Sequence, residues 1–171
     1  MQREACIEFN MYGSGVYILN GPAGTGKTFT LKVILELSKR LNNDIDSDFL
    51  ALAPTGKATK VVSSSINKKC LTIHRALGLN FDNKEKKHFE DIDENRIMCD
   101  EVGMLDVEIG SILLKSIKDK SKLFLLGDVH QLLSVGPGNV LRDLIESKLI
   151  KVVTLNVQKR QGKGSEITYN G

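Results

Sequence analysis

The chain has 171 residues, 41% of them hydrophobic and 26% charged, which fits one globular domain with a buried core and excludes a disordered chain. Its formal net charge of +3 is a weak basic excess, which permits a polyanionic partner without requiring one. Three cysteines without a Cys-x-x-Cys pair, and no apolar run near the ~20 residues of a membrane span, lead us to expect a cytoplasmic protein with no disulfide framework, zinc site or membrane segment.

Short apolar runs alternate with amphipathic stretches along the chain. The apolar runs predict buried strands at residues 16–20, 49–53, 96–100, 122–128 and 151–155. Helices are predicted at residues 27–41, 57–64, 73–77, 107–117 and 139–147. Continuous apolar strands, as opposed to alternating ones, are typical of a parallel sheet that is covered on both faces. The order of elements therefore predicts an α/β fold, with a parallel β-sheet flanked by helices on both faces.

Two segments interrupt this alternation. Residues 80–95, NFDNKEKKHFEDIDEN, are polar and charged, and their composition leaves open a solvated loop or a short inserted hairpin. Residues 161–171 show no periodicity, so we expect them to form a fraying tail.

A glycine-rich motif follows the first predicted strand. Residues 21–28, GPAGTGKT, match G-x-x-x-x-G-K-S/T in full and open a predicted helix, which is the context that a phosphate-binding loop requires. The glycines let the backbone curl so that its N–H groups point at phosphate oxygens, and the helix start adds its positive dipole end. The residues expected to surround the nucleotide phosphates are Gly21, Pro22, Ala23, Gly24, Thr25, Gly26, Lys27 and Thr28. Lys27 can reach the β- and γ-phosphates and Thr28 can bind Mg²⁺, so the motif predicts ATP and Mg²⁺ as cofactors.

An acidic pair follows the third predicted strand, in the sequence MCDEVGMLD. Asp100 would lie at the carboxyl end of that strand, where α/β folds bind ligands, and its carboxylate can hold Mg²⁺ through water. Glu101 points differently and can polarise an attacking water as a general base. A helix-capping or solvated acidic pair is the alternative, and the phosphate loop in the same chain favours the metal and base roles. Asp106 is predicted to cap the next helix.

Three further stretches complete a recognisable order of motifs: LAPTGKAT at 52–59, CLTIHRALG at 70–78 and LLGDVHQLLSVGPGNVLRDLI at 125–145. Together with the phosphate loop and the acidic pair, they make the chain resemble the first motor domain of superfamily 1 DNA helicases. The likeness is to the RecD-like group, which includes the exodeoxyribonuclease V alpha subunit, and it spans residues 2–161. It implies a P-loop NTPase with a RecA-like fold that couples ATP hydrolysis to 5′-to-3′ translocation on single-stranded DNA, in recombination or repair.

The resemblance also implies roles for residues that the motifs alone leave unassigned. Gln2 is similar to the glutamine that recognises adenine. Gln131 resembles the sensor that couples the γ-phosphate to the grip on DNA, and Arg160 resembles an arginine that reaches the γ-phosphate. Lys27 and Glu101 keep the catalytic roles given above. The positions similar to the family's single-stranded DNA contacts are Pro54, Thr55, Lys57, Thr72, His74 and Arg75.

Each DNA candidate has a structural alternative. A helix start after Thr55 offers N–H groups to a DNA phosphate, with Lys57 either facing that phosphate or solvated. Thr72 is equally well explained as the cap of the short helix at 73–77. His74 is either a packed, hydrogen-bonded residue or a DNA contact.

The resemblance implies a motor domain over residues 1–160, with the insert at 80–95, and a tail at 161–171 that marks the boundary to a second motor domain outside this chain. Expected partners are single-stranded DNA, that second motor domain and other subunits of a nuclease–helicase complex. A nucleotide-gated module that binds single-stranded DNA without turning ATP over is the alternative function.

Overall fold

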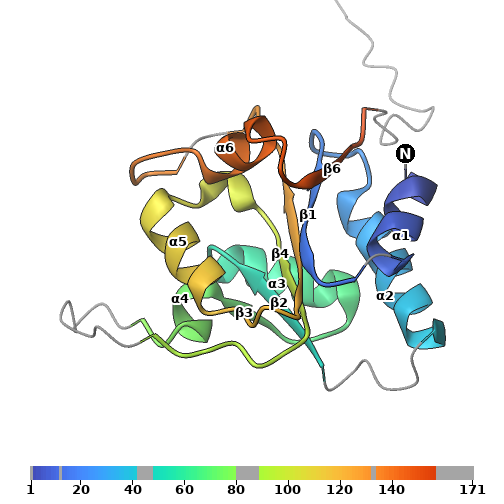
Figure 1. The fold of residues 1–171 in the computed structure, drawn as a ribbon, viewed down its shortest axis with the longest axis horizontal. Coiled ribbons are helices and arrows are strands. Elements are labelled where there is room, and N and C mark those ends of the chain that lie inside the picture. The colour runs from blue at the N-terminus through green and yellow to red at the C-terminus, as the bar shows by residue number, and fades with distance from the viewer. Residues whose placement is uncertain (1, 12, 42–47, 80–88, 132–133, 157–171) are drawn as a thin grey trace, which may run out of the picture.

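The computed structural model describes residues 2–11, 13–41, 48–79, 89–131 and 134–156 (Figure 1). Six parallel strands form one sheet in the order β3-β2-β4-β5-β1-β6. The strands are β1 (Gly15–Asn20), β2 (Phe49–Ala53), β3 (Cys70–Thr72), β4 (Arg96–Cys99), β5 (Lys122–Gly127) and β6 (Lys151–Thr154). The helices are α1 (Gln2–Met11), α2 (Lys27–Leu41), α3 (Gly56–Ile66), α4 (Ile73–Ala76), α5 (Val107–Lys115) and α6 (Val140–Glu146), with a 3₁₀ turn η1 (Val102–Met104). The predicted α/β class and parallel sheet are confirmed.

One strand and one α-helix have no counterpart among the predicted elements. The edge strand β3 has three residues, too few for a periodic signal, and it forms by pairing with β2. The helix α1 buries Ala5, Cys6 and Phe9, and its last turn is held by Lys122 Nζ, which donates to Phe9 O at 3.3 Å. Both elements therefore depend on contacts with distant parts of the chain.

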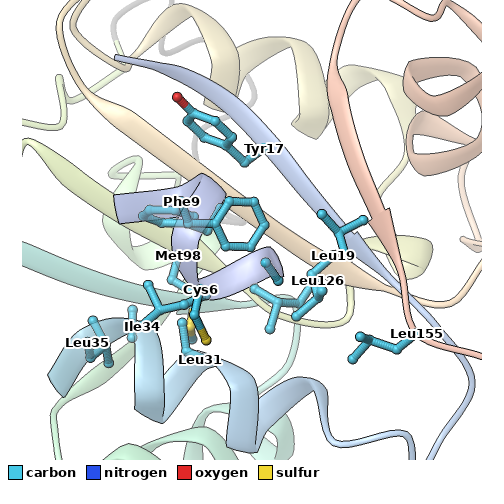
Figure 2. Close-up of a cluster of buried hydrophobic side chains, with 14 of the residues drawn as sticks. Cys6, Phe9, Tyr17, Leu19, Leu31, Ile34, Leu35, Met98, Leu126 and Leu155 are labelled. Carbon is cyan, nitrogen blue, oxygen red and sulfur yellow. The ribbon is translucent and has the colours of Figure 1, made fainter. Parts of the chain in front are cut away.

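The sheet is covered on both faces, and each face has its own hydrophobic core. Because side chains alternate along a strand, Tyr17 and Leu19 of β1 face one core while Ile18 faces the other. Helices α1, α2 and α3 bury side chains against the first face, and α4, α5 and α6 against the second. In the first core the ring of Phe9 packs edge-on against the ring of Tyr17, with centroids 5.4 Å apart (Figure 2). The ring of Phe9 also packs edge-on against that of Phe124, with centroids 5.1 Å apart. The ring of Phe9 thus holds α1 against strands β1 and β5.

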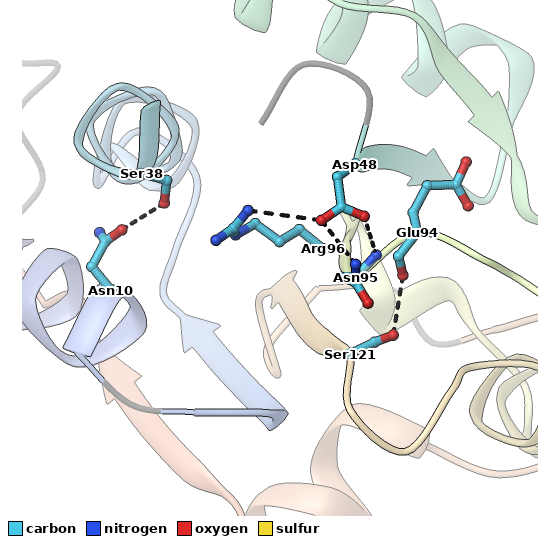
Figure 3. Close-up of polar contacts among 7 residues, drawn as sticks. All are labelled: Asn10, Ser38, Asp48, Glu94, Asn95, Arg96 and Ser121. Carbon is cyan, nitrogen blue, oxygen red and sulfur yellow. Dashed lines mark hydrogen bonds and ion pairs between the residues drawn. The ribbon is translucent and has the colours of Figure 1, made fainter. Parts of the chain in front are cut away.

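Polar side chains close the amino-terminal edge of the sheet (Figure 3). Asp48 accepts hydrogen bonds from the backbone N and the side-chain Nδ2 of Asn95 at 2.7 and 3.0 Å, with Arg96 Nη1 4.0 Å from its carboxylate. Ser121 Oγ donates to Glu94 O at 3.1 Å. These contacts join the starts of β2, β4 and β5, so the loops that carry the predicted motifs lie at the opposite, carboxyl-terminal edge.

The polar insert is described in part. Residues 80–88, Arg160 and the predicted tail at 161–171 lie outside the described residues. Residues 89–95 return to the fold: Glu90 N donates to Leu77 O at 3.2 Å, and buried Ile92 forms a parallel bridge with Ile117.

Within the described ranges, no helix is long and apolar enough to cross a membrane.

Candidate nucleotide site

The glycine-rich loop leaves the end of β1 and enters α2, as predicted. Gly21 N donates to Gly127 O at 3.0 Å, which ties the start of the loop to β5. A side chain at Gly21 would place its Cβ 2.7 Å from Leu155 O, so only glycine fits there. Gly24 and Gly26 have φ angles of 82° and 90°, in the left-handed region where a Cβ is strained.

Threonines hold the loop in this shape. Thr25 is buried, and its Oγ1 donates to Pro22 O at 2.8 Å across the bend. Thr30 donates from both its backbone N and its Oγ1 to Gly26 O, at 2.8 and 2.9 Å, which completes the first turn of α2. Hydrogen bonds from Thr25 and Thr30 therefore stabilise the conformation of the loop.

Lys27 folds back over the loop. Its Nζ donates to the carbonyl oxygens of Gly21 and of Pro22, the latter at 3.1 Å. Burial lowers the pKa of Lys27, and the charges of Asp128 and Asp100 oppose that effect by stabilising the ammonium. The ammonium group thus contacts the loop and is stabilised by the charges of two carboxylates.

The acidic pair stands at the end of β4, opposite the loop. The backbone N of Asp100 donates to Leu52 O at 3.0 Å, and Asp100 Oδ1 accepts from the backbone N of Glu101 at 2.9 Å. Burial raises the pKa of Asp100, against the opposing effects of that hydrogen bond and of Lys27. The pKa of Glu101 is raised by burial and by the charge of Asp100, while Lys57 lowers it. Both carboxyls therefore bind protons more readily than in water.

Gln131 lies in a tight turn after β5. Its backbone N donates to Asp128 O at 3.1 Å, and Asp128 Oδ1 accepts from His130 N at 3.0 Å. Asp128 is only 7% exposed. Its charge acts on Lys27 together with that of Asp100. Asp128 was not identified from the sequence as a site residue, although the GDVHQ stretch contains it.

These elements enclose one cleft of about 610 Å³. Its lining residues are Gln2, Ala23, Gly24, Gly26, Lys27, Thr28, Phe29, Val61, Asp100, Glu101, Gly127 and Gln131. Sequence reasoning had not identified Phe29, Val61 or Gly127. Gln2 reaches the cleft from α1, where its Nε2 donates to Thr25 O at 3.1 Å. Most of the predicted nucleotide-binding residues thus line this one cleft, whereas Gly21, Pro22 and Thr25 belong to the loop without lining the cleft.

The donor set of the cleft fits a magnesium ion. Mg²⁺ prefers oxygen ligands and is usually held by one or two protein groups together with substrate phosphates and water. The Thr28 hydroxyl and the Asp100 carboxylate both line the cleft. Among the described residues there is no group of three His, Cys, Asp or Glu side chains that could hold a metal ion.

The predicted DNA contacts lie beside this cleft and do not line it. Ala53 and Thr72 pair in register at the ends of β2 and β3, so the segments that follow them emerge together. Thr55 Oγ1 accepts from Ala58 N at 3.1 Å, and Thr72 Oγ1 accepts from Arg75 N at 3.3 Å, so both threonines cap helices. The capping alternative for Thr72 is confirmed, and an accepting hydroxyl still has a hydrogen to donate.

The remaining DNA candidates differ in exposure. Lys57 and Arg75 are exposed, while Pro54 and His74 are half-buried. The backbone O of His74 accepts from Leu79 N at 2.8 Å. For His74 the choice between packing and DNA contact stays a prediction.

A phosphate loop after β1 and an acidic pair after β4, on a parallel sheet of this order, define a P-loop NTPase with a RecA-like fold. The chain belongs to the AAA_30 family, described as an AAA domain, which matches residues 1–170.

Two of the curated relatives are named as helicases. The chain is 35% identical to the ATP-dependent DNA helicase dda of Enterobacteria phage T4, over 70% of this chain and 28% of the relative. It is 28% identical to the ATP-dependent RecD2 DNA helicase of Deinococcus radiodurans, over 80% of this chain and 19% of the relative. The Pif1 helicase of Candida albicans has the same fold, with a TM-score of 0.66 and 20% identity over 94% of this chain and 40% of that one.

These comparisons confirm the predicted likeness to the first motor domain of superfamily 1 helicases, and membership of this family implies nucleotide binding. The chain spans less than a third of the two curated relatives.

Proposed function

We propose that this chain is the ATP-hydrolysing first motor domain of a RecD-like 5′-to-3′ DNA helicase, and that it drives movement on single-stranded DNA. The proposal is carried by one cleft in which the phosphate loop meets Asp100, Glu101 and Gln131. The exposed cations Lys57 and Arg75 follow strands β2 and β3 at the same edge of the sheet. Because β2 pairs directly with β4, a change at the acidic pair has a short path to the DNA candidates. The direction of movement rests on the family resemblance.

In this proposal the loop N–H groups and Lys27 bind the phosphates, and Gln2 beside the loop recognises the adenine. Glu101 accepts a proton from the attacking water, and a carboxylate whose pKa is raised by burial is the stronger base. When bound by Thr28 and, through water, by Asp100, Mg²⁺ would neutralise charge on the β- and γ-phosphates.

The γ-phosphate is assigned two further contacts. Gln131 lines the cleft. It would hydrogen bond the γ-phosphate, a contact that a triphosphate offers and a diphosphate does not. Arg160 keeps its proposed role as a second contact, by resemblance, since it lies outside the described residues.

The rim of the cleft supports a second domain as partner. Phe29 and Val61 line the cleft and are 61% and 60% exposed, so two large apolar side chains at its rim are left for a partner to cover. We assign this rim to the second motor domain that the resemblance implies. A relative from Mycobacterium tuberculosis is named RecBCD enzyme subunit RecD, and assembly with further subunits is proposed on that ground.

Phosphate release by the 171-residue chain, with and without an oligo-dT strand, tests the proposal. We expect slow ATP turnover that oligo-dT raises, no unwinding of a duplex, and a fall in turnover of about 10²–10⁴ in Glu101→Gln. No turnover under either condition, with nucleotide still changing the affinity for oligo-dT, would instead establish the nucleotide-gated binding module. Strand separation by the chain alone would contradict the need for a second domain.

A further inference from the structure

Asn20 is the last residue of β1 and directly precedes the phosphate loop, outside the motif that begins at Gly21. Its side-chain Oδ1 accepts a hydrogen bond from the backbone N of Val129 at 3.3 Å. The two residues are 109 positions apart, so the bond joins the strand that carries the loop to the turn that follows β5. Nothing in the nucleotide motifs accounts for this contact.

The turn in question carries Gln131. Within it, Asp128 O accepts from Gln131 N and Asp128 Oδ1 accepts from His130 N, so these two amides are satisfied inside the turn. The amide of Val129 points out of the turn and is satisfied by Asn20. The internal bonds fix the shape of the turn, and the bond to Asn20 fixes where the turn lies relative to the loop.

Backbone pairing between the strands ends just before this point. Asn20 is in register with Gly127, and Gly21 N donates to Gly127 O at 3.0 Å. Past Gly127 the chain leaves the sheet, and Asn20 Oδ1 provides the next hydrogen bond from the loop strand to the departing segment. We infer that Asn20 is a positioning residue. Its side-chain amide fixes the position, relative to the phosphate loop, of the turn that carries Gln131.

This inference rests on the proposed function, in which Gln131 contacts the γ-phosphate. A hydrogen bond to a charged phosphate depends steeply on donor placement, so a displaced turn would weaken the contact with a triphosphate. Binding of a diphosphate, which has no γ-phosphate, would not change. Asn20 therefore contributes to the distinction between ATP and ADP without touching either nucleotide.

The test is the ratio of two dissociation constants, for fluorescent ADP and for fluorescent ATPγS, measured on the 171-residue chain. Loss of one charge-assisted hydrogen bond corresponds to a change of about tenfold or more, so Gln131→Ala should lower the preference for ATPγS by about that factor. Asn20→Ala should lower the same ratio severalfold and leave ADP affinity unchanged. The double variant should be no worse than Gln131→Ala, because both changes remove the same contact.

Three variants sharpen the test. Asn20→Asp keeps an acceptor for Val129 N, so at high salt, where the added charge is screened, its ratio should lie closer to that of the unaltered chain than the ratio of Asn20→Ala does. In Asn20→Ser the side chain is too short for its oxygen to reach Val129 N, so this variant should behave like Asn20→Ala. It replaces Asn20→Ala in the test if Asn20→Ala does not fold. Asn95→Ala removes the bond from Asn95 Nδ2 to Asp48 at the opposite edge of the sheet and should leave the ratio unchanged.

Two results would overturn the positioning role of Asn20. One is an unchanged ratio in Asn20→Ala alongside a lowered ratio in Gln131→Ala. The other is an equal loss of ADP and ATPγS affinity with a lower melting temperature, which marks a merely structural residue. An unchanged ratio in Gln131→Ala would overturn the sensor role in the proposed function, and the role of Asn20 with it.

Discussion

The backbone N of Glu101 donates to Asp100 Oδ1 at 2.9 Å, and Glu101 itself has φ and ψ of 55° and 38°. Successive side chains of a strand point to opposite faces, so a continued β4 would have separated the two carboxylates. The left-handed turn at Glu101 instead directs both into one cleft. Such a conformation costs about 1–3 kcal/mol in a residue other than glycine and is typical of functional sites.

The first prediction concerns Glu101 as the base. Glu101→Gln keeps the size of the side chain and removes the proton acceptor, so the turnover number should fall by about 10²–10⁴ while ATP affinity stays within about twofold. Phosphate release and fluorescent nucleotide binding measure the two quantities. Glu108→Gln, at an exposed acidic position on α5, is the matched control and should leave both unchanged. Undiminished turnover in Glu101→Gln would remove Glu101 from the mechanism.

The second prediction concerns pH and Asp100. Burial raises the pKa of Asp100 in the folded chain above its unfolded value of about 3.9. The protonated carboxyl therefore contributes stability that is fully present below the unfolded pKa and is lost as pH rises through the folded pKa. Asn cannot ionise, so Asp100→Asn does not lose this stability as pH rises. We therefore expect its melting temperature to exceed that of the unaltered chain at pH 7.5.

The difference between Asp100→Asn and the unaltered chain should shrink as the pH approaches 4. Asp93→Asn, which breaks an exposed ion pair with Lys118 at 2.7 Å, is the control and should shift the melting temperature less. A pH-independent difference would mean that charge burial at Asp100 is not its cause. Melting curves are measured without nucleotide or Mg²⁺, because both would bind the folded chain.

The third prediction concerns Lys27. Its Nζ contacts in the structure are two carbonyl oxygens of the loop, and burial lowers its pKa, so its removal should cost little stability. A charge-assisted hydrogen bond contributes about 1.5–3 kcal/mol, so Lys27→Ala should weaken ATP binding at least about tenfold. Lys32→Ala, an exposed lysine on the same helix, should bind normally. Unchanged affinity for a fluorescent ATP analogue in Lys27→Ala would refute the phosphate role.

The sequence predicted those parts of the site that are local patterns. The phosphate loop is recognisable because its spacing follows one strand and opens one helix, and the acidic pair because it ends another strand. The contacts of Asn20 and Asp128 were not predictable in this way. They depend on β1 and β5 being neighbours, which no short pattern encodes, although both residues adjoin motifs that were recognised.

The elements that escaped prediction have the same physical origin. Strand β3 exists because Cys70–Thr72 pair with β2, and α1 is held by Phe9 in the core and by Lys122 from β5. The exposed rim residues Phe29 and Val61 carry no sequence signal either, since each belongs to an ordinary amphipathic helix. Tertiary context, and not local preference, decides all of these features.

The last prediction separates DNA binding from helix capping at the start of α3. Thr55 Oγ1 accepts from Ala58 N, so Thr55→Ala should cost about 1 kcal/mol of folding free energy, whereas Thr55→Ser keeps the cap. Lys57 is exposed, and Lys57→Ala should leave stability unchanged. Each phosphate contact contributes about −0.7 to the slope of log affinity against log salt for a single strand, so Lys57→Ala should make that slope shallower by about 0.7.

Binding of labelled oligo-dT at several salt concentrations measures this slope, and thermal melting measures the stability. Lys115→Ala is the matched control for charge, because Lys115 is exposed on α5, which covers the other face of the sheet from α3. If Lys115→Ala weakens binding as much as Lys57→Ala, the interaction is with overall charge and not with the edge formed by β2 and β3. A slope that changes only in Lys57→Ala, with Thr55→Ser binding normally, places a DNA phosphate at the start of α3.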